Sequence, residues 1–495
     1  MSNSISTLTS TFIITFAKIS ILKKLLGETI IYGIGAILPR VITFLLNPLY
    51  INYIDKESFA QFGNLYAWIA YVNILLTFGF ETSFFRFSAE DENRKKAFNT
   101  SYWFIFGLAA SFLVMVLLFS NPLSVMMDYA DNPEFIRWCA IIAFFDAICT
   151  IPFAWLRFHN MPVRYSAIRL LSIVIQTVIV IALFRFIPKE TSELLGMKTQ
   201  VAYPFFSNMV ASIATFLMLL PIALKVKLEF SRELFGRMFR YSWPVMIAGL
   251  AFMFNENFDK LIQYYKIPKA DAGAYSGCYK LAVLMTLFVT AYRMGIEPFF
   301  FKQMKNDNAK ITYAKITEYF AFFASIVAMG IIANISWLKR LFIPDSSYWT
   351  AIDIVPIIVI ANLFFGIYYN LSTWYKVTDQ TKYGTVISWL GALITIALHF
   401  LFLEKYGFMA SAWITLFAYF VMMLTSYFLG QKHYPIPYRS RKISAFLILL
   451  TIFAFISVKI FNYNFWIGNL LFLLYTAILI FSEKDFILSR LKIKN

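Results

Sequence analysis

The sequence predicts an all-α, polytopic membrane protein, and three observations carry this prediction. Of the 495 residues, 60% are hydrophobic and 14% are charged, whereas soluble domains carry about 25% charged residues. The mean hydropathy is +0.67. Apolar runs of about 20 residues, the length of a helix that crosses a bilayer, recur along the chain. We therefore exclude a soluble globular fold.

The apolar runs predict about fourteen transmembrane helices. We expect a cytoplasmic interfacial lead-in at 1–27, an N-lobe at 28–230, a C-lobe at 231–432, and two C-terminal helices with a basic cytoplasmic tail at 433–495. The predicted spans are 28–50, 62–84, 98–120, 136–156, 166–187, 201–224, 240–262, 274–297, 314–337, 352–373, 383–403, 408–430, 443–461 and 465–482. Because the last two spans are separated only by residues 462–464, a re-entrant pair is the alternative at that end.

An internal echo suggests that the two lobes are homologous. The stretch 295–302 reads Gly-Ile-Glu-Pro-Phe-Phe-Phe-Lys, and the stretch 79–86 reads Gly-Phe-Glu-Thr-Ser-Phe-Phe-Arg. Each copy closes a pair of apolar runs. Internal repeats of this kind in transporters place the substrate site between the repeats. We therefore expect two six-helix lobes around a central cavity.

The charges of the loops predict the topology. Loops rich in Lys and Arg, such as the one with Arg94, Lys95 and Lys96, alternate with poorer or acidic ones, such as the loop with Asp128 and Asp131. Because basic loops stay in the cytoplasm, both termini are expected there. The net charge of +17 is explained by topology and by contact with anionic membrane lipids, so we expect no nucleic-acid partner.

The sequence contains no pattern that indicates a metal site, a cofactor site or an enzyme. Cys139, Cys149 and Cys278 lie in or beside apolar runs without a pairing pattern, and three scattered histidines lack ligand spacing. We expect neither a metal site nor a cofactor. The loops are too short to form an extramembrane catalytic domain, so we do not expect an enzyme.

Five ionisable residues inside the spans are candidates for function, because charges at membrane depth normally face a bundle interior or a wet cavity. Glu256, Asp259 and Lys260 share one face of the seventh predicted helix. A structural interpretation pairs Glu256 with Lys260 at the favourable four-residue spacing and leaves Asp259 as the surplus carboxylate. Asp259, together with Asp146 and Asp353, is then a candidate site for a coupling proton or sodium ion.

Basic residues in the spans predict an anion site. Arg40 lies mid-way along the first span, without an acidic residue within a helical turn, and Lys280 and Arg293 lie in the eighth span. We expect these residues, with Lys260, to be cavity cations that meet an anionic substrate. For Arg40, pairing with a carboxylate of another span and snorkelling to the membrane interface remain the alternatives.

Glu81 and Glu297 occupy equivalent ends of the second and eighth spans. Each is followed closely by a basic residue, Arg86 or Lys302. We expect a structural role for both carboxylates, as a cytoplasmic gate or as a helix-end ion pair.

The motif residues of the two lobe openings resemble the Wzx-type polysaccharide flippases, a family of the multidrug, oligosaccharidyl-lipid and polysaccharide exporter superfamily. The resemblance rests on residues 259–262 (Asp-Lys-Leu-Ile), 272–276 (Ala-Gly-Ala-Tyr-Ser), the Tyr279-Lys280 pair and Pro298. Near the N-terminus it rests on the basic Arg40, the turn at 56–63 and the stretch 79–86. The diagnostic residues are confined to the first two and the seventh and eighth spans.

The resemblance implies a flippase of the bacterial cytoplasmic (inner) membrane. Its substrate would be an undecaprenyl-pyrophosphate-linked oligosaccharide, moved outward by alternating access of the two lobes for surface polysaccharide synthesis. Arg40 and Lys280 would meet the pyrophosphate, H⁺ or Na⁺ would be the coupling ion, and a polysaccharide polymerase is a candidate partner. The alternatives are a multidrug or cation exporter of the same superfamily and, from another class, a membrane polysaccharide polymerase or ligase.

Overall fold

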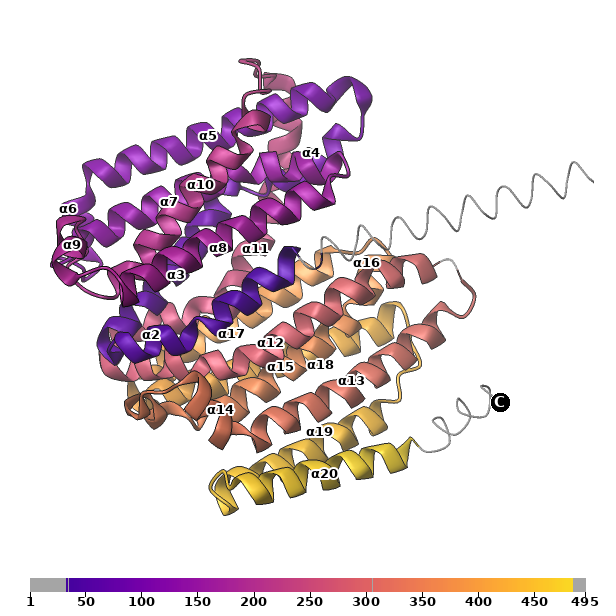
Figure 1. The fold of residues 1–495 in the computed structure, drawn as a ribbon. Coiled ribbons are helices and arrows are strands. Elements are labelled where there is room, and N and C mark those ends of the chain that lie inside the picture. Colours follow the sequence, from indigo (N-terminus) through magenta and orange to yellow (C-terminus); the bar gives the residue numbers. More distant parts are fainter. Residues whose placement is uncertain (1–32, 34, 305, 484–495) are drawn as a thin grey trace, which may run out of the picture. The chain divides into compact units, whose positions relative to one another are not determined.

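A computed structural model describes residue 33, residues 35–304 and residues 306–483 of the chain (Figure 1). All regular secondary structure in these residues is helical, which confirms the predicted all-α class. The expected lead-in at 1–27, the start of the first span and the basic tail from Lys484 onward lie outside the described residues.

The helices follow one another along the chain with short connections. Residues 35–45 form a helical segment that is broken at Leu46. After it come α2 (Asn47–Tyr53), α3 (Lys56–Thr77), α4 (Phe80–Ser88), α5 (Arg94–Leu118), α6 (Ser120–Met126), α7 (Pro133–Phe158), α8 (Pro162–Arg185), α9 (Lys189–Leu194), α10 (Ala202–Ala223), α11 (Arg232–Lys266), α12 (Lys269–Gln303), α13 (Ala309–Ala333), α14 (Ile335–Phe342), α15 (Ile354–Leu371), α16 (Thr373–Val377), α17 (Lys382–Tyr406), α18 (Phe408–His433), α19 (Ser440–Phe455) and α20 (Phe465–Ser482). Short 3₁₀ turns lie at Asp91–Asn93 and Ser346–Ala351, and a π turn at Ile456–Ile460 extends α19.

In the described residues, 12 helices are long and apolar enough to cross a membrane. The first and seventh predicted spans are the two that do not appear among them. The first span begins outside the described residues, and α11 covers the seventh as a helix of 35 residues that is rich in charged side chains. A multi-pass membrane protein is thus confirmed, and the number fourteen stays a prediction.

The chain divides into two compact units, which differ from a simple division into sequence halves. Among the described residues, the first unit holds 35–43, Leu76–Thr191 and Pro204–Trp243, and the second holds Phe44–Leu75, Ser192–Tyr203 and everything from Pro244. Within α11 the division falls at Pro244. Because proline has no N–H group, it removes one hydrogen bond from the helix at this point.

The internal echo in the sequence is not matched in backbone conformation. Phe78 (φ 51°) and Gly79 (φ 69°) are both left-handed and separate α3 from α4. The second predicted span, 62–84, is therefore two helices. Gly295, the equivalent of Gly79, lies inside the continuous helix α12.

In the second unit, α15 is the central helix. Its sequence, IVPIIVIANLFFGIYYNL, is apolar on all sides, and such a helix is stable where other helices surround it. It packs against α12, α13 and α18. This packing positions Tyr369 and Asn370 beside Arg293 and Glu297 of α12.

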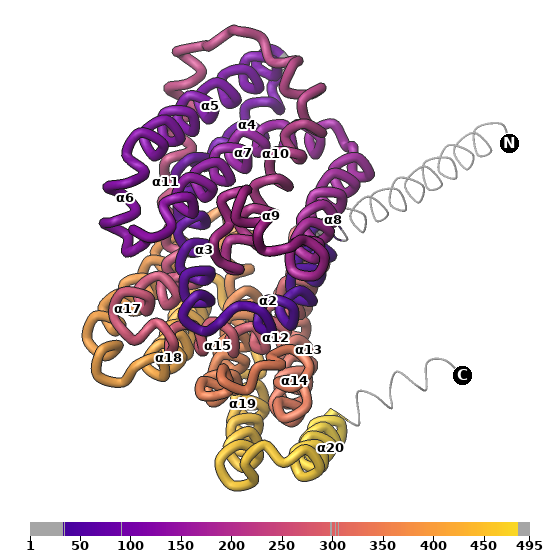
Figure 2. Tube along the Cα trace, turned by 60° about the vertical axis from the view of Figure 1, so that its left-hand side comes forward, coloured from indigo at the N-terminus to yellow at the C-terminus, as the bar shows by residue number. Residues whose placement is uncertain are grey.

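The two C-terminal helices form an antiparallel pair that packs against α13, as Figure 2 also shows. Asn462 and Tyr463 adopt left-handed conformations in the turn, and the Asn464 side chain accepts hydrogen bonds from the N–H groups of Trp466 and Ile467, at 3.0 and 3.2 Å. Both helices are long and apolar enough to cross a membrane. The spanning arrangement is therefore favoured over the re-entrant one.

Ion pairs fasten this helical pair to the second unit at both of its ends. At one end the Lys459 ammonium lies 2.7 Å from the Asp353 carboxylate, and the Tyr463 hydroxyl donates to the same carboxylate at 2.5 Å. At the other end Glu318 of α13 pairs with Lys442 at 2.9 Å. The helical pair is therefore an integral part of the second unit.

A glycine in α12 sets the approach of this helix to the start of α3. A Cβ atom on Gly273 would collide with the backbone carbonyl of Lys56, whereas a Cβ atom on Gly295 would meet nothing within 4 Å. Because a backbone carbonyl cannot rotate away, the helices must separate. We predict that Gly273→Ala lowers the free energy of unfolding by about 1–3 kcal/mol.

The matched control is Gly295→Ala in the same helix, which we expect to be neutral or to stabilise the protein by up to about 1 kcal/mol. Thermal unfolding of the purified protein in detergent measures both variants. Equal melting temperatures for the two variants would contradict the close contact between α12 and α3.

Candidate functional site

The carboxylate of Asp259 is held by groups from two helices of the second unit. The Lys260 ammonium lies 3.1 and 3.2 Å from its two oxygens, and the Tyr275 hydroxyl of α12 donates to it at 2.5 Å. The same ammonium lies 3.7 Å from the centre of the Tyr279 ring. Asp259 is 5% exposed. Its charge is thus neutralised and sealed within the unit.

Glu256 does not form the ion pair that the helical spacing suggested. Its carboxylate accepts a hydrogen bond from the Tyr419 hydroxyl of α18 at 2.7 Å, and Lys260 reaches only its backbone oxygen, at 3.3 Å. The expected Glu256–Lys260 pair is therefore wrong. Tyr419 turns Glu256 toward α18, while Tyr275 holds Asp259 where Lys260 can reach it. Of these two carboxylates, Glu256 and not Asp259 is the one without a direct ion pair among the described residues, although the charges of Lys260 and Arg293 act on it.

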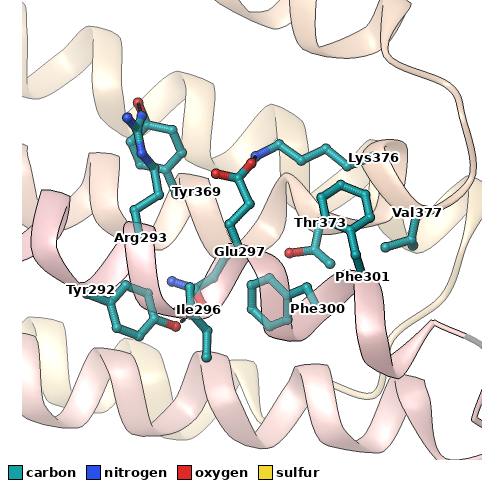
Figure 3. Close-up of a pocket in the computed structure, with 11 residues that line it drawn as sticks. Tyr292, Arg293, Ile296, Glu297, Phe300, Phe301, Tyr369, Thr373, Lys376 and Val377 are labelled. Atoms are coloured by element: carbon teal, nitrogen blue, oxygen red, sulfur yellow. Dashed lines mark hydrogen bonds and ion pairs between the residues drawn. The ribbon is translucent and has the colours of Figure 1, made fainter. Parts of the chain in front are cut away.

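Two cations of α12 form no direct ion pair in the described part of the chain, although the charge of Glu256 attracts Arg293. Lys280 is half-buried, with its ammonium 5.6 Å from the centre of the Phe62 ring. Arg293 donates to the Tyr369 hydroxyl at 2.6 Å and lies over the same ring. Arg293 and Tyr369 are seen together in Figure 3. Both cations therefore keep hydrogen-bonding capacity for an anion.

The structure separates Lys280 from Arg293. They are 13 residues apart in one continuous helix, which corresponds to about 20 Å along the helix axis. Lys280 is near enough to Lys260 for the two charges to act on each other, whereas Arg293 contacts Tyr369 of α15. The two cations thus define two separate positions along α12.

Glu297 and Lys376 form an ion pair of 2.7 Å beside Arg293, at the small cavity drawn in Figure 3. In the first unit, Glu81 pairs with Arg157 of α7. The basic residue that follows Glu81 in the sequence, Arg86, lies instead over the Tyr241 ring, 4.4 Å from its centre. The partner of Glu81 is thus Arg157 at the end of a neighbouring helix and not the following Arg86, and the gate or helix-end role of Glu81 stays a prediction.

A larger cleft, of about 250 Å³, adjoins the Arg293 cavity and shares Tyr369 and Lys376 with it. We call it the α15–α17 cleft. Aromatic rings and hydroxyl groups form most of its wall: Phe252, Phe365, Tyr368, Tyr369, Tyr375, Ser372, Thr381, Thr385 and Ser388. Such a wall combines flat apolar faces with hydrogen-bonding groups.

The remaining predicted residues lie in the first unit. Asp146 of α7 accepts a hydrogen bond from the Ser212 hydroxyl of α10 at 2.8 Å. Arg40 is exposed on the helical segment before α2. The structure thus gives Asp146 a neutral partner.

A buried network in the second unit was not predicted. The Gln263 amide donates to the Ser411 hydroxyl at 2.7 Å, and His399 Nε2 lies 3.1 Å from the same hydroxyl. His399 Nδ1 lies 2.7 Å from the carbonyl oxygen of Thr395 and must donate to it. The network joins α11, α17 and α18. No sequence signal marks this network, because its members lie on three separate helices. Gln263 and Ser411, for example, are 148 residues apart in the sequence.

The fold is that of known membrane transporters. The lipid II flippase MurJ in an inward closed conformation superimposes with a TM-score of 0.68, at 15% identity over 92% of this chain and 100% of that chain. An inward-facing multidrug resistance MATE family transporter of the MOP superfamily gives 0.62, at 12% identity over 84% and 98%. A MATE transporter of Vibrio cholerae gives 0.56, at 14% identity over 83% and 97%. No protein of curated function matches the sequence.

A family model described as polysaccharide biosynthesis protein matches residues 25–304. This match spans more than half of the chain. The protein therefore belongs to the polysaccharide biosynthesis protein family, and the resemblance indicated by the sequence motifs is confirmed.

The geometry at Asp259 makes a prediction about stability. Because removal of one partner leaves a buried charge unpaired, Asp259→Asn should lower the free energy of unfolding by about 3 kcal/mol. The double variant Asp259→Asn with Lys260→Gln should recover part of this loss. A double-mutant cycle of thermal unfolding measures the coupling between the two side chains.

The control for this cycle is Lys266→Gln, which removes a largely exposed ion pair with Glu404 and should change stability by less than about 1 kcal/mol. Strict additivity of the Asp259 and Lys260 substitutions would contradict the sealed pair.

Proposed function

We propose that this protein is a flippase that moves an undecaprenyl-pyrophosphate-linked oligosaccharide from the cytoplasmic to the outer leaflet of a bacterial inner membrane. The family match and the transporter fold support a flippase or transporter for a lipid-linked substrate. The outward direction is what the family resemblance implies, and the loop charges support both termini in the cytoplasm. In this proposal no covalent bond of the substrate changes, so the protein is not an enzyme.

The excess of cations on α11 and α12 is the observation that supports an anionic substrate. The Asp259 charge is taken up by Lys260 and the Glu297 charge by Lys376. Lys280 and Arg293 are left for a ligand. Phosphate groups such as those of a pyrophosphate form strong, charge-assisted hydrogen bonds with such cations.

The separation of the two cations suggests that the pyrophosphate binds at two successive positions along α12, which we call stations. Arg293, on the cytoplasmic half of α12 by the predicted topology, would meet the pyrophosphate first. Lys280, about 20 Å further along the helix axis, would meet it later, near Lys260. Because each station has one cation that forms no ion pair among the described residues, binding at either would be weak enough to allow passage. Arg40 would contribute from the N-lobe.

The α15–α17 cleft supports an oligosaccharide as the other part of the substrate. Sugar rings offer an apolar face for contact with aromatic rings and several hydroxyls for hydrogen bonding. Tyr368, Tyr369 and Tyr375, with the Ser and Thr hydroxyls, match these two needs. The cleft shares Tyr369 with the Arg293 cavity, so one substrate would extend from the phosphate station into the cleft.

Alternating access is the motion proposed for transport. The division between the two units crosses α11 at Pro244 and crosses α3 just before the break at Phe78 and Gly79. At both places the helical hydrogen-bonding pattern is interrupted or ends, and such places bend at the lowest cost.

One observation favours a second candidate, a multidrug or cation exporter. Glu256 is a partly buried carboxylate that accepts a hydrogen bond from the neutral Tyr419 hydroxyl. In a flippase, Glu256 would instead be the site for a coupling H⁺ or Na⁺, together with Asp259 or Asp146.

A polysaccharide polymerase is the partner that we propose for the flippase, and it would receive the translocated oligosaccharide.

The proposal predicts the phenotype of Lys280→Gln and Arg293→Gln. Each variant should lower surface polysaccharide by at least tenfold at near-normal protein abundance, since a charge-assisted hydrogen bond contributes about 1.5–3 kcal/mol. Arg40→Ala should act in the same way. Quantification of surface polysaccharide and immunoblotting in a complemented deletion strain measure the two quantities.

Lys269→Gln is the matched control. Lys269 lies at the start of the same helix, with its ammonium 4.9 Å from the centre of the Tyr264 ring, and we expect normal polysaccharide. If polysaccharide and abundance fell together in the Lys280 and Arg293 variants, these residues would be folding elements. Loss of resistance to cationic drugs with unchanged polysaccharide would favour the exporter.

A further inference from the structure

A groove of about 130 Å³ lies in the second unit, between α13, α15, α18 and α19. It is separate from the α15–α17 cleft and shares none of its residues. Its wall is mainly apolar, formed by Ile367, Leu371, Met423, Leu424, Phe428 and Leu447. Phe428 is 64% exposed, so the groove borders the surface that faces lipid in a multi-pass membrane protein.

One end of the groove is polar and contains an unsatisfied hydroxyl. Tyr438 and Ser440, which precede and begin α19, line this end. Within the described residues, the buried Tyr438 hydroxyl has no hydrogen-bond partner. Buried hydroxyls without a partner are rare in folded proteins. The groove therefore offers a hydrogen-bond donor to a bound molecule at its polar end.

The same end of the groove is positively charged. Arg439 has a 67% exposed side chain and lies 3.4 Å from Glu318, whose charge Lys442 already neutralises at 2.9 Å. The amino end of α19 adds the positive end of a helix dipole. Lys432 in the last turn of α18 and Arg441 in the first turn of α19 flank the connection between these helices. The predicted topology places this connection on the cytoplasmic side, where anionic lipids are concentrated.

We propose that the groove binds an anionic phospholipid of the cytoplasmic leaflet. One acyl chain would lie along the apolar wall, and the phosphate would accept a hydrogen bond from the Tyr438 hydroxyl and lie beside Arg439. Basic pockets between transmembrane helices on the cytoplasmic side bind anionic head groups in this way. The lipid would join α18 to α19, and so would link the C-terminal helical pair to the rest of the second unit. This site does not depend on which substrate the protein carries.

The test uses the full-length protein, purified in neutral detergent and incubated with phosphatidylglycerol, phosphatidylcholine or undecaprenyl phosphate. Native mass spectrometry measures the lipid retained per protein molecule. We expect phosphatidylglycerol to be retained at about one per chain. Arg439→Gln should weaken its retention about fivefold, as expected for one basic residue at an anionic head group. Tyr438→Phe and Ser444→Phe, which fills the groove, should weaken it as well.

Arg441→Gln is the matched control and should leave retention unchanged. Arg441 is an exposed basic residue in the first turn of α19, whereas Arg439 stands between Tyr438 and Ser440, which both line the groove. If Arg439→Gln and Arg441→Gln lost phosphatidylglycerol to the same extent, general surface charge would explain the retention and the proposed site would be overturned. Equal retention of phosphatidylcholine, or stronger retention of undecaprenyl phosphate, would also overturn the proposal. Size-exclusion profiles identify a variant that fails to fold, and the exposed Arg439 substitution then decides the outcome.

Discussion

The charge balance along α11 and α12 is the constraint on which the rest of the structure depends. A charged side chain at membrane depth costs about 2.5–3.5 kcal/mol on insertion scales, and this segment carries several. The second unit offsets that cost by pairing Asp259 with Lys260 and closing the pair with the Tyr275 hydroxyl. Tyr419 of α18 satisfies Glu256. The same pairing leaves Lys280 and Arg293 as two cations of α12 that form no ion pair among the described residues.

The architecture around these charges combines firm packing with places that can bend. The apolar helix α15 anchors the second unit, and the C-terminal helices are fastened to it through Asp353 at one end and Glu318 at the other. The chain crosses from one unit to the other within α11 at Pro244. A transporter needs this combination, because a lobe must stay rigid enough to hold its charge pairs while the connections change shape.

Hydropathy predicted the fold closely, because a bilayer sets helix length and each run of apolar residues reports on its own environment. The predicted spans 383–403 and 408–430, for example, coincide with α17 and α18. The break at Phe78 was not predictable from hydropathy, because backbone conformation there depends on tertiary contacts. The partners of the site residues were missed for the same reason. Tyr419 lies 163 positions from Glu256, and helical spacing reports only on neighbours within one helix.

The central claim is that the protein moves a lipid-linked oligosaccharide between leaflets. Its most direct test is the distribution of complete lipid-linked oligosaccharide between the two leaflets in bacterial cells from which the gene for this protein has been deleted. A membrane-impermeant reagent that modifies only the outer leaflet measures this distribution. The account predicts that the oligosaccharide accumulates in the cytoplasmic leaflet and is protected from the reagent. An unchanged distribution, with complete oligosaccharide still reaching the outer leaflet, would contradict it.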